Sequence, residues 1–145
     1  MDVDRPWLRD VVVAGAAGGL FAGVPSTAYA LATRRSPIEA TVAAGTLVLP
    51  GESRPVVLIA AALPVHAALS VGWAGVLAAM LPARPSRGVA AAIGAAAGLV
   101  IAAVDLGLVG RRFPRIRALP MPPQVADHVA YGVTVGLVVA HRRSS

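Results

Sequence analysis

Residues 55–83, PVVLIAAALPVHAALSVGWAGVLAAMLPA, contain no Asp, Glu, Lys or Arg. A helix that crosses a bilayer needs about 20 mostly apolar residues, because about 30 Å of hydrocarbon is crossed at about 1.5 Å per residue. This stretch satisfies that requirement with residues to spare. We therefore predict that it forms a transmembrane helix.

Three more segments are candidates for crossing. Residues 11–33 contain no charged side chain, and residues 88–110 contain only Asp105. Residues 123–140 are shorter and carry Asp127 near their start. We predict that all three cross the membrane.

Residues 37–51 are largely apolar but too short to cross, and they end in the turn-forming pair Pro50-Gly51. A re-entrant or interfacial segment is favoured over a fifth span. The expected fold is an all-α membrane protein. It is a four-helix transmembrane bundle with a short re-entrant or interfacial segment between helices 1 and 2, forming one transmembrane domain over residues 1–145.

The composition agrees with this fold and excludes several function classes. Hydrophobic residues make up 57% of the chain and charged residues 14%, and the mean hydropathy is +0.72, which is far more apolar than a soluble domain. Cysteine is absent, which excludes thiol catalysis and Cys-ligated metal sites. The sequence has no phosphate-binding loop, metalloprotease motif or nucleophile elbow, so we expect no enzyme, catalytic residue, cofactor or metal.

The net charge of +6 comes from arginines that lie in short groups between the apolar segments. Nucleic-acid binding would need a basic stripe on a soluble surface, often with stacking aromatic residues. We therefore expect no nucleic acid as a partner, and instead a lipid bilayer with anionic headgroups. The candidate headgroup contacts are Arg111, Arg112, Arg115 and Arg117.

Small residues spaced four apart favour close helix packing in lipid. This GxxxG spacing occurs in three of the four predicted helices, and the second has a looser version. The residues are Gly15, Gly19 and Gly23; Gly94 and Gly98; Gly132 and Gly136; and, in the second helix, Ala68, Gly72 and Gly75.

Pro25 and Pro64 fall inside the first two predicted helices. Each removes a backbone donor and tends to kink its helix. They are interpreted as tolerated membrane prolines, with a hinge or a local widening of the bundle as the alternative.

Alternating spans bring the long connections 34–54 and 111–124 to one end of the bundle, which we call the loop-rich face. Ionisable residues lie in the membrane half beneath it, and His66 is expected near mid-membrane at a depth of about 16 Å. An ionisable group inside a span costs about 2.5–3.5 kcal/mol on insertion scales and normally faces the bundle or a water-filled cavity.

Two explanations of these groups stay open. In the first, Asp105 and Asp127 pair with the arginines of residues 111–117, and His66 makes one interhelical hydrogen bond. In the second, a polar cavity relays protons or binds a small ion or polar solute. The candidate residues of that cavity are His66, Ser70, Asp105, Asp127, His128 and Tyr131.

The arginines do not orient the chain in the membrane. Those near the span ends divide six against seven between the two faces, which decides nothing by the positive-inside rule. This near balance permits an antiparallel homodimer, so we expect a second copy or another membrane protein as a candidate partner.

Two stretches resemble known families. The run Gly19-Leu20-Phe21-Ala22-Gly23-Val24 with Ser26, followed by Arg35-Ser36-Pro37 and then His66 and Ser70, resembles the YagU-type bacterial inner-membrane proteins. The run Arg111-Arg112-Phe113-Pro114-Arg115-Ile116, followed by Pro123-Gln124, Asp127-His128 and Gly132, resembles small uncharacterised actinobacterial membrane proteins. The first resemblance implies a bacterial inner-membrane location and a link to envelope or pH stress, without implying a mechanism.

We therefore expect a multi-pass bacterial inner-membrane protein that is not an enzyme and that acts as a structural, accessory or envelope-stress component. The alternative is a small oligomeric transporter or channel for protons, ions or a small polar solute. A membrane-embedded enzyme ranks third.

Overall fold

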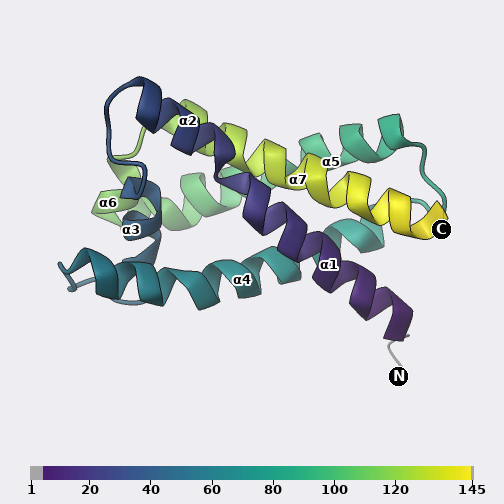
Figure 1. Ribbon diagram of the computed structural model, residues 1–145, viewed down its shortest axis with the longest axis horizontal. Coiled ribbons are helices and arrows are strands. Elements are labelled where there is room, and N and C mark those ends of the chain that lie inside the picture. The colour runs from purple at the N-terminus through teal and green to yellow at the C-terminus, as the bar shows by residue number, and fades with distance from the viewer. Residues whose placement is uncertain (1–4, 145) are drawn as a thin grey trace.

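In the computed structural model, which describes residues 5–144, the chain is helical and forms no strand within that range. The helices are α1 (Arg5–Ala22), α2 (Val24–Ala32), α3 (Glu39–Gly45), α4 (Pro55–Met80), α5 (Arg87–Ala102), the π-helix η1 (Ala103–Val109), the 3-10 helix η2 (Gly110–Arg112), α6 (Pro114–Arg117) and α7 (Met121–Ser144). Figure 1 shows that α3 and α6 lie together at one end of the long helices, and that the end of α7 lies at the other.

Three stretches of helix are long and apolar enough to cross a membrane: Pro6–Ala32, Pro55–Met80 and Arg87–Arg112. They overlap the first three predicted spans. The first helix begins at Arg5, before the predicted start at residue 11, so the polar residues ahead of the apolar run are helical as well.

The fourth predicted segment forms a helix, α7, but it is not among these three candidates. Its N-terminal half carries Gln124, Asp127 and His128, which lower its apolarity. α7 packs against α1, α2, α4 and α5, and Figure 1 shows it between α1 and α5. Much of its surface is therefore covered by protein.

The two prolines inside the predicted helices behave differently. The helix is interrupted at Gly23, and α2 restarts with Pro25 in its first turn, where the missing N–H is tolerated. Pro64 lies inside α4, which continues through it without interruption. Only the first proline is therefore associated with a break in the helix.

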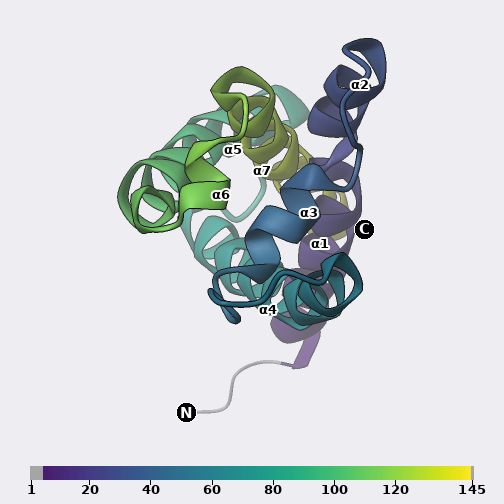
Figure 2. The same ribbon diagram turned by 90° about the vertical axis from the view of Figure 1, so that its left-hand side faces the viewer.

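Residues 37–51 contain the seven-residue helix α3, which is too short to cross a bilayer. α3 packs against α4 and α6, and Figure 2, viewed along the long helices, shows it lying across their end. The contact with α4 is close, because a Cβ on Gly45 would lie 2.8 Å from Leu58 Cα.

Glycines allow α5 and α7 to touch through their backbones. A Cβ on Gly98 would lie 2.8 Å from Val129 Cα, and one on Gly132 would lie 3.0 Å from the backbone nitrogen of Gly98. On the other side of the bundle, a Cβ on Gly15 would lie 2.8 Å from Val71 Cα. Side chains at these positions would force the helices apart.

Two glycines in the predicted packing pattern face open space. Cβ atoms added to Gly23 and Gly72 would meet nothing within 4 Å, so neither residue lies in a packing seam within this chain. Gly23 lies at the break between α1 and α2, and Gly72 lies on an exposed side of α4. Spacing alone does not decide which side of a helix meets a neighbour.

The outer surfaces of the helices are strongly apolar. Leu20 is 80% exposed, Val56 78% and Leu108 67%. Large apolar side chains at this exposure would favour aggregation in water, whereas lipid solvates them. The observed surface therefore agrees with the three long apolar helices in pointing to a membrane.

Candidate functional site

Asp127 of α7 accepts a hydrogen bond from the first turn of α2. Its carboxylate oxygen Oδ1 accepts a hydrogen bond of 2.8 Å from the backbone N–H of Ser26. The first N–H groups of a helix have no intrahelical acceptor, and no side chain at Gly23 caps α2. Asp127 therefore acts as an N-cap supplied by another helix, and negative charge is favoured at this end of a helix.

His128 connects α7 to η1. Its Nδ1 lies 2.7 Å from the carbonyl oxygen of Gln124, and its Nε2 lies 3.5 Å from Oδ2 of Asp105. A carbonyl oxygen only accepts, so Nδ1 carries a proton. The facing Nε2 and carboxylate then attract each other only when they share a second proton, as imidazolium with carboxylate or as neutral imidazole with carboxylic acid.

The π-helix η1 contains Asp105. A π-helical turn inserts one residue relative to an α-helix and changes the direction in which the following side chains point, and such turns are frequent at functional sites. The length and apolarity of residues 88–110 did not predict this local geometry.

His66 and Ser70 lie where α4 meets α1. Nε2 of His66 makes a hydrogen bond of 3.2 Å with the carbonyl oxygen of Gly19. A Cβ on Gly19 would lie 2.9 Å from Ser70 Oγ, so glycine leaves room for these side chains. The hydroxyl of Tyr131 on α7 donates to the carbonyl oxygen of Ser70. The predicted interhelical hydrogen bond of His66 is therefore confirmed.

Four ionisable groups from α4, η1 and α7 form a series, which we call the polar cluster: His66, Asp127, His128 and Asp105. Asp127 interacts electrostatically with both histidines, and Asp105 interacts with His128. Within residues 5–144, no three groups of this kind converge tightly enough to hold a metal ion. The cluster is thus arranged as a series and not as a coordination shell.

The predicted pairing of the two aspartates with arginines is wrong. Among the described residues, no ion pair joins Asp105 or Asp127 to an arginine; Asp105 faces His128, and Asp127 bonds to Ser26. The arginines at 111, 112, 115 and 117 are exposed at the loop-rich face. They follow the π-helix and extend away from the bundle interior.

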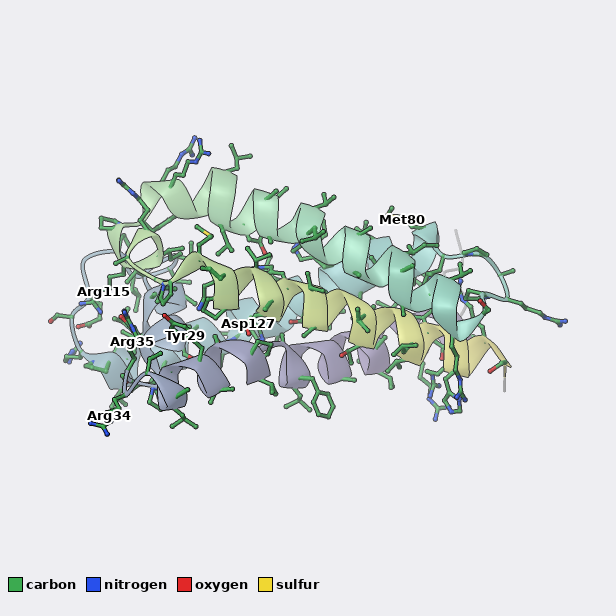
Figure 3. The ribbon with its side chains drawn as sticks, turned by 90° about the horizontal axis from the view of Figure 1, so that it is seen from above. Tyr29, Arg34, Arg35, Met80, Arg115 and Asp127 are labelled. Carbon is green, nitrogen blue, oxygen red and sulfur yellow. The ribbon has the colours of Figure 1, made fainter. Side chains whose placement is uncertain are left out.

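The interior of the half opposite the loop-rich face is apolar and closely packed. Leu77 of α4 and Val135 and Val139 of α7 are almost completely buried there, among the alanines of the same core. Figure 3 labels Tyr29, Arg35 and Asp127 toward one end of the molecule and Met80 toward the other. The polar cluster therefore lies in one half only.

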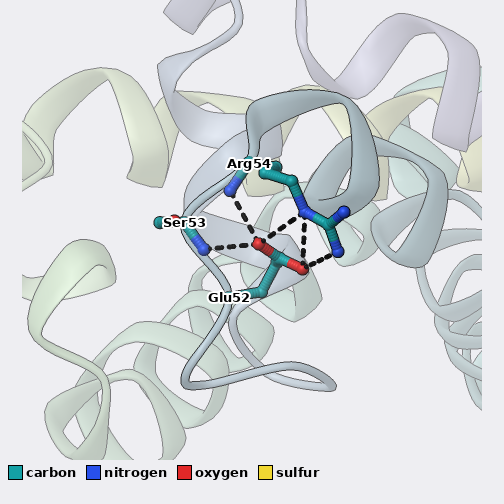
Figure 4. A network of polar contacts seen from close by, with 3 residues as sticks. All are labelled: Glu52, Ser53 and Arg54. Carbon is teal, nitrogen blue, oxygen red and sulfur yellow. Dashed lines mark hydrogen bonds and ion pairs between the residues drawn. The ribbon is translucent and has the colours of Figure 1, made fainter.

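A separate polar network lies on the loop-rich face before α4 (Figure 4). Oε1 of Glu52 accepts from the backbone N–H groups of Ser53 and Arg54 at 2.7 and 2.8 Å, and Oε2 accepts from the Arg54 guanidinium at 2.8 Å. The side-chain bond from Arg54 is the main reason that the pKa of Glu52 falls from 4.5 to about 2. This network fixes the turn that precedes α4.

Sequence reasoning identified the cluster residues but missed two backbone partners. The N–H of Ser26 and the carbonyl of Gln124 hold Asp127 and His128 in place. Gly23 followed two residues later by Pro25 was an available signal for the Ser26 partner, because a proline near a helix start suggests a new first turn.

No family model, curated protein or solved structure matches this chain.

Proposed function

We propose that this protein is a multi-pass, non-enzymatic bacterial inner-membrane component that takes up and releases protons at the polar cluster from the loop-rich face. In this proposal four helices cross the membrane, and α7 is the enclosed one. The contacts of α7 with α1, α2, α4 and α5 support its crossing, because surrounding helices shield its polar side chains from lipid.

The observation that carries the proposal is the pairing of Asp105 with His128. With Nδ1 committed to the Gln124 carbonyl, the pair is stable with one further proton and unfavourable without it. Asp127 is the adjacent acceptor, and its Oδ1 accepts a hydrogen bond from the backbone N–H of Ser26. Gain or loss of a proton therefore changes the contacts that hold α2 and η1 on α7.

The closely packed apolar half of the bundle favours a proton-responsive component over a pore within a single chain. A path across the membrane would have to pass the packed side chains of Leu77, Val135 and Val139. The resemblance to YagU-type proteins, which carries an association with acid resistance, supports a component that responds to protons. A transporter would need an additional path between subunits.

Infrared spectroscopy of protein reconstituted in bilayers tests the proposal. Between pH 4 and 9, the C=O stretching band of a protonated carboxyl group should appear and be lost, and Asp105→Asn or Asp127→Asn should remove part of that change. Glu52→Gln is the matched control, because Glu52 lies outside the cluster and its pKa of about 2 keeps it ionised over this range, so this variant should leave the cluster band in place. A pH-dependent band that is identical in both cluster variants and the unaltered protein would refute the proposal.

Proton flux into liposomes containing a pH-sensitive dye separates a responsive component from a transporter. With a potassium diffusion potential as driving force, the proposal predicts no more flux than empty liposomes show. Flux that is abolished by Asp127→Asn would instead establish the transporter.

A second candidate function is that of an accessory subunit, favoured by the position of His66. This polar residue is exposed on α4 beside Leu63 and Leu69, which are 61% and 45% exposed. An imidazole is unfavourable against lipid tails, so a second copy or another membrane protein would cover it. Native mass spectrometry of protein purified from membranes tests this by reporting bound chains and lipids.

We also propose that Arg111, Arg112, Arg115 and Arg117 contact anionic headgroups. All four are exposed at the loop-rich face, and each arginine near an anionic surface contributes about 1 kcal/mol of attraction. Their combined replacement by Gln should weaken retention of anionic lipid during purification.

A further inference from the structure

We propose that a small space between α2, α3 and the connection from α6 to α7 is the aqueous entry to the polar cluster, and that the Arg35–Glu39 ion pair is its gate. The inference rests on the proposed function and adds the route and the occupant. The occupant is a single water molecule, which brings solvent next to the residues that hold Asp127 and His128.

The space has the size and lining that one water needs. Its volume is about 20 Å³, whereas one water requires about 10–15 Å³ by this measure and two to four polar partners. The lining includes Ser26 and Tyr29 from α2, Arg35 and Glu39 around the start of α3, and Gln124 of α7. Hydroxyl, guanidinium, carboxylate and amide groups are all present among these.

The inner wall of the space is joined to the polar cluster by backbone hydrogen bonds. Ser26, which lines it, donates its N–H to Asp127 at 2.8 Å. Gln124, which also lines it, accepts through its carbonyl from His128 at 2.7 Å. A water in this space would lie beside Ser26 and Gln124, which are bonded to Asp127 and His128. These backbone bonds place the space near the cluster and do not themselves carry a proton.

The outer wall contains a closed ion pair. Nε of Arg35 lies 3.1 Å from Oε2 of Glu39, and its NH2 group lies 3.0 Å from Oε1. The two side chains are 41% and 39% exposed, and screening by solvent makes an exposed pair of this kind weak. Thermal motion is sufficient to open it.

Beyond the ion pair lies an open depression of about 480 Å³ on the loop-rich face, and it shares Arg35, Ser36 and Glu39 with the smaller space. Bulk water, the ion pair, the one-water space and the polar cluster thus follow one another inward. In Figure 3, Arg35, Tyr29 and Asp127 lie in the same region of the molecule.

Thiol labelling tests the entry, because the chain contains no cysteine of its own. A water-soluble methanethiosulfonate reacts with the thiolate, which forms only where water reaches the sulfur. Ser26→Cys and Gln124→Cys introduce thiols on the lining, and Ala74→Cys, at a 0% exposed core position, is the control. In bilayers, both lining variants should react at least tenfold faster than the control.

The gate is tested by adding Glu39→Gln to Gln124→Cys. Loss of the ion pair should raise the labelling rate several-fold and leave that of Ala74→Cys unchanged. Lining thiols that react as slowly as Ala74→Cys would overturn the entry, and an unchanged rate in the Glu39→Gln background would overturn the gate. Fast labelling without a pH-dependent carboxyl band would refute the proposed function and leave the entry standing.

Discussion

The contact between α5 and α7 provides the sharpest test of the fold, through the substitution Gly132→Ala. The added Cβ would lie 2.9 Å from the carbonyl carbon of Gly94, closer still to its oxygen, and 3.0 Å from the nitrogen of Gly98. These are backbone atoms of a long helix, so no side chain can rotate away. The two helices must separate instead.

The magnitude follows from the packing. A gap of about 0.5–1 Å already removes a quarter to a half of the attraction between each pair of facing atoms, and forcing additional atoms into a packed interior costs about 1–3 kcal/mol. Replacing glycine by alanine also favours a helix by about 0.5–1 kcal/mol. Gly72→Ala isolates the steric part, because it shares this gain and its Cβ meets nothing within 4 Å.

The assay is the free energy of unfolding in mixed micelles, measured by titration with sodium dodecyl sulfate and followed by circular dichroism. Gly132→Ala should be less stable than Gly72→Ala by about 1–3 kcal/mol. Equal stability of the two variants, with unchanged helix content, would refute the close backbone contact between α5 and α7.

Three further predictions concern individual polar contacts. Arg143 donates to the carbonyl oxygens of Ala78, Leu81 and Pro82 at the end of α4. Arg143→Gln should therefore lower the free energy of unfolding by about 1.5–3 kcal/mol. The control Arg84→Gln, at an exposed position, should change it by less than about 0.5 kcal/mol. Tyr131→Phe removes the bond to the Ser70 carbonyl and should cost about 0.5–1.5 kcal/mol in the same titration. The pKa of Glu52 is lowered from 4.5 to about 2, so its stabilising contribution is complete above pH 4.5 and is lost as the pH falls toward 2. In carbon NMR, Arg54→Gln should return that pKa toward 4.5, and an unchanged titration would contradict the role of the guanidinium.

Sequence reasoning predicted the helices well where length and apolarity decide them. Arg87–Arg112 and Pro55–Met80 are each 26 residues long and match the uncharged or nearly uncharged runs. Asp127 and Tyr131 lie on one side of their helix, because positions four apart share a side. These results depend only on local spacing.

Other features were not predictable, because they depend on which helices become neighbours. Asp105 is close in sequence to Arg111 and Arg112, but its carboxylate lies 3.5 Å from His128 of α7. Gly15 and Gly72 have the same local chemistry, yet the first touches the α4 backbone and the second faces open space. Periodicity defines the sides of a helix and leaves its partner undetermined.

The sequence by itself therefore determined that the chain forms long apolar helices with ionisable groups in three of them, because length and hydropathy are local properties. Only the tertiary structure decided that α7 lies among the other helices, that Asp127 caps α2, and that Asp105 faces His128. The physical reason is that burial and hydrogen bonding of a polar group are settled by its neighbours in space, and those neighbours lie up to 132 residues away along the chain.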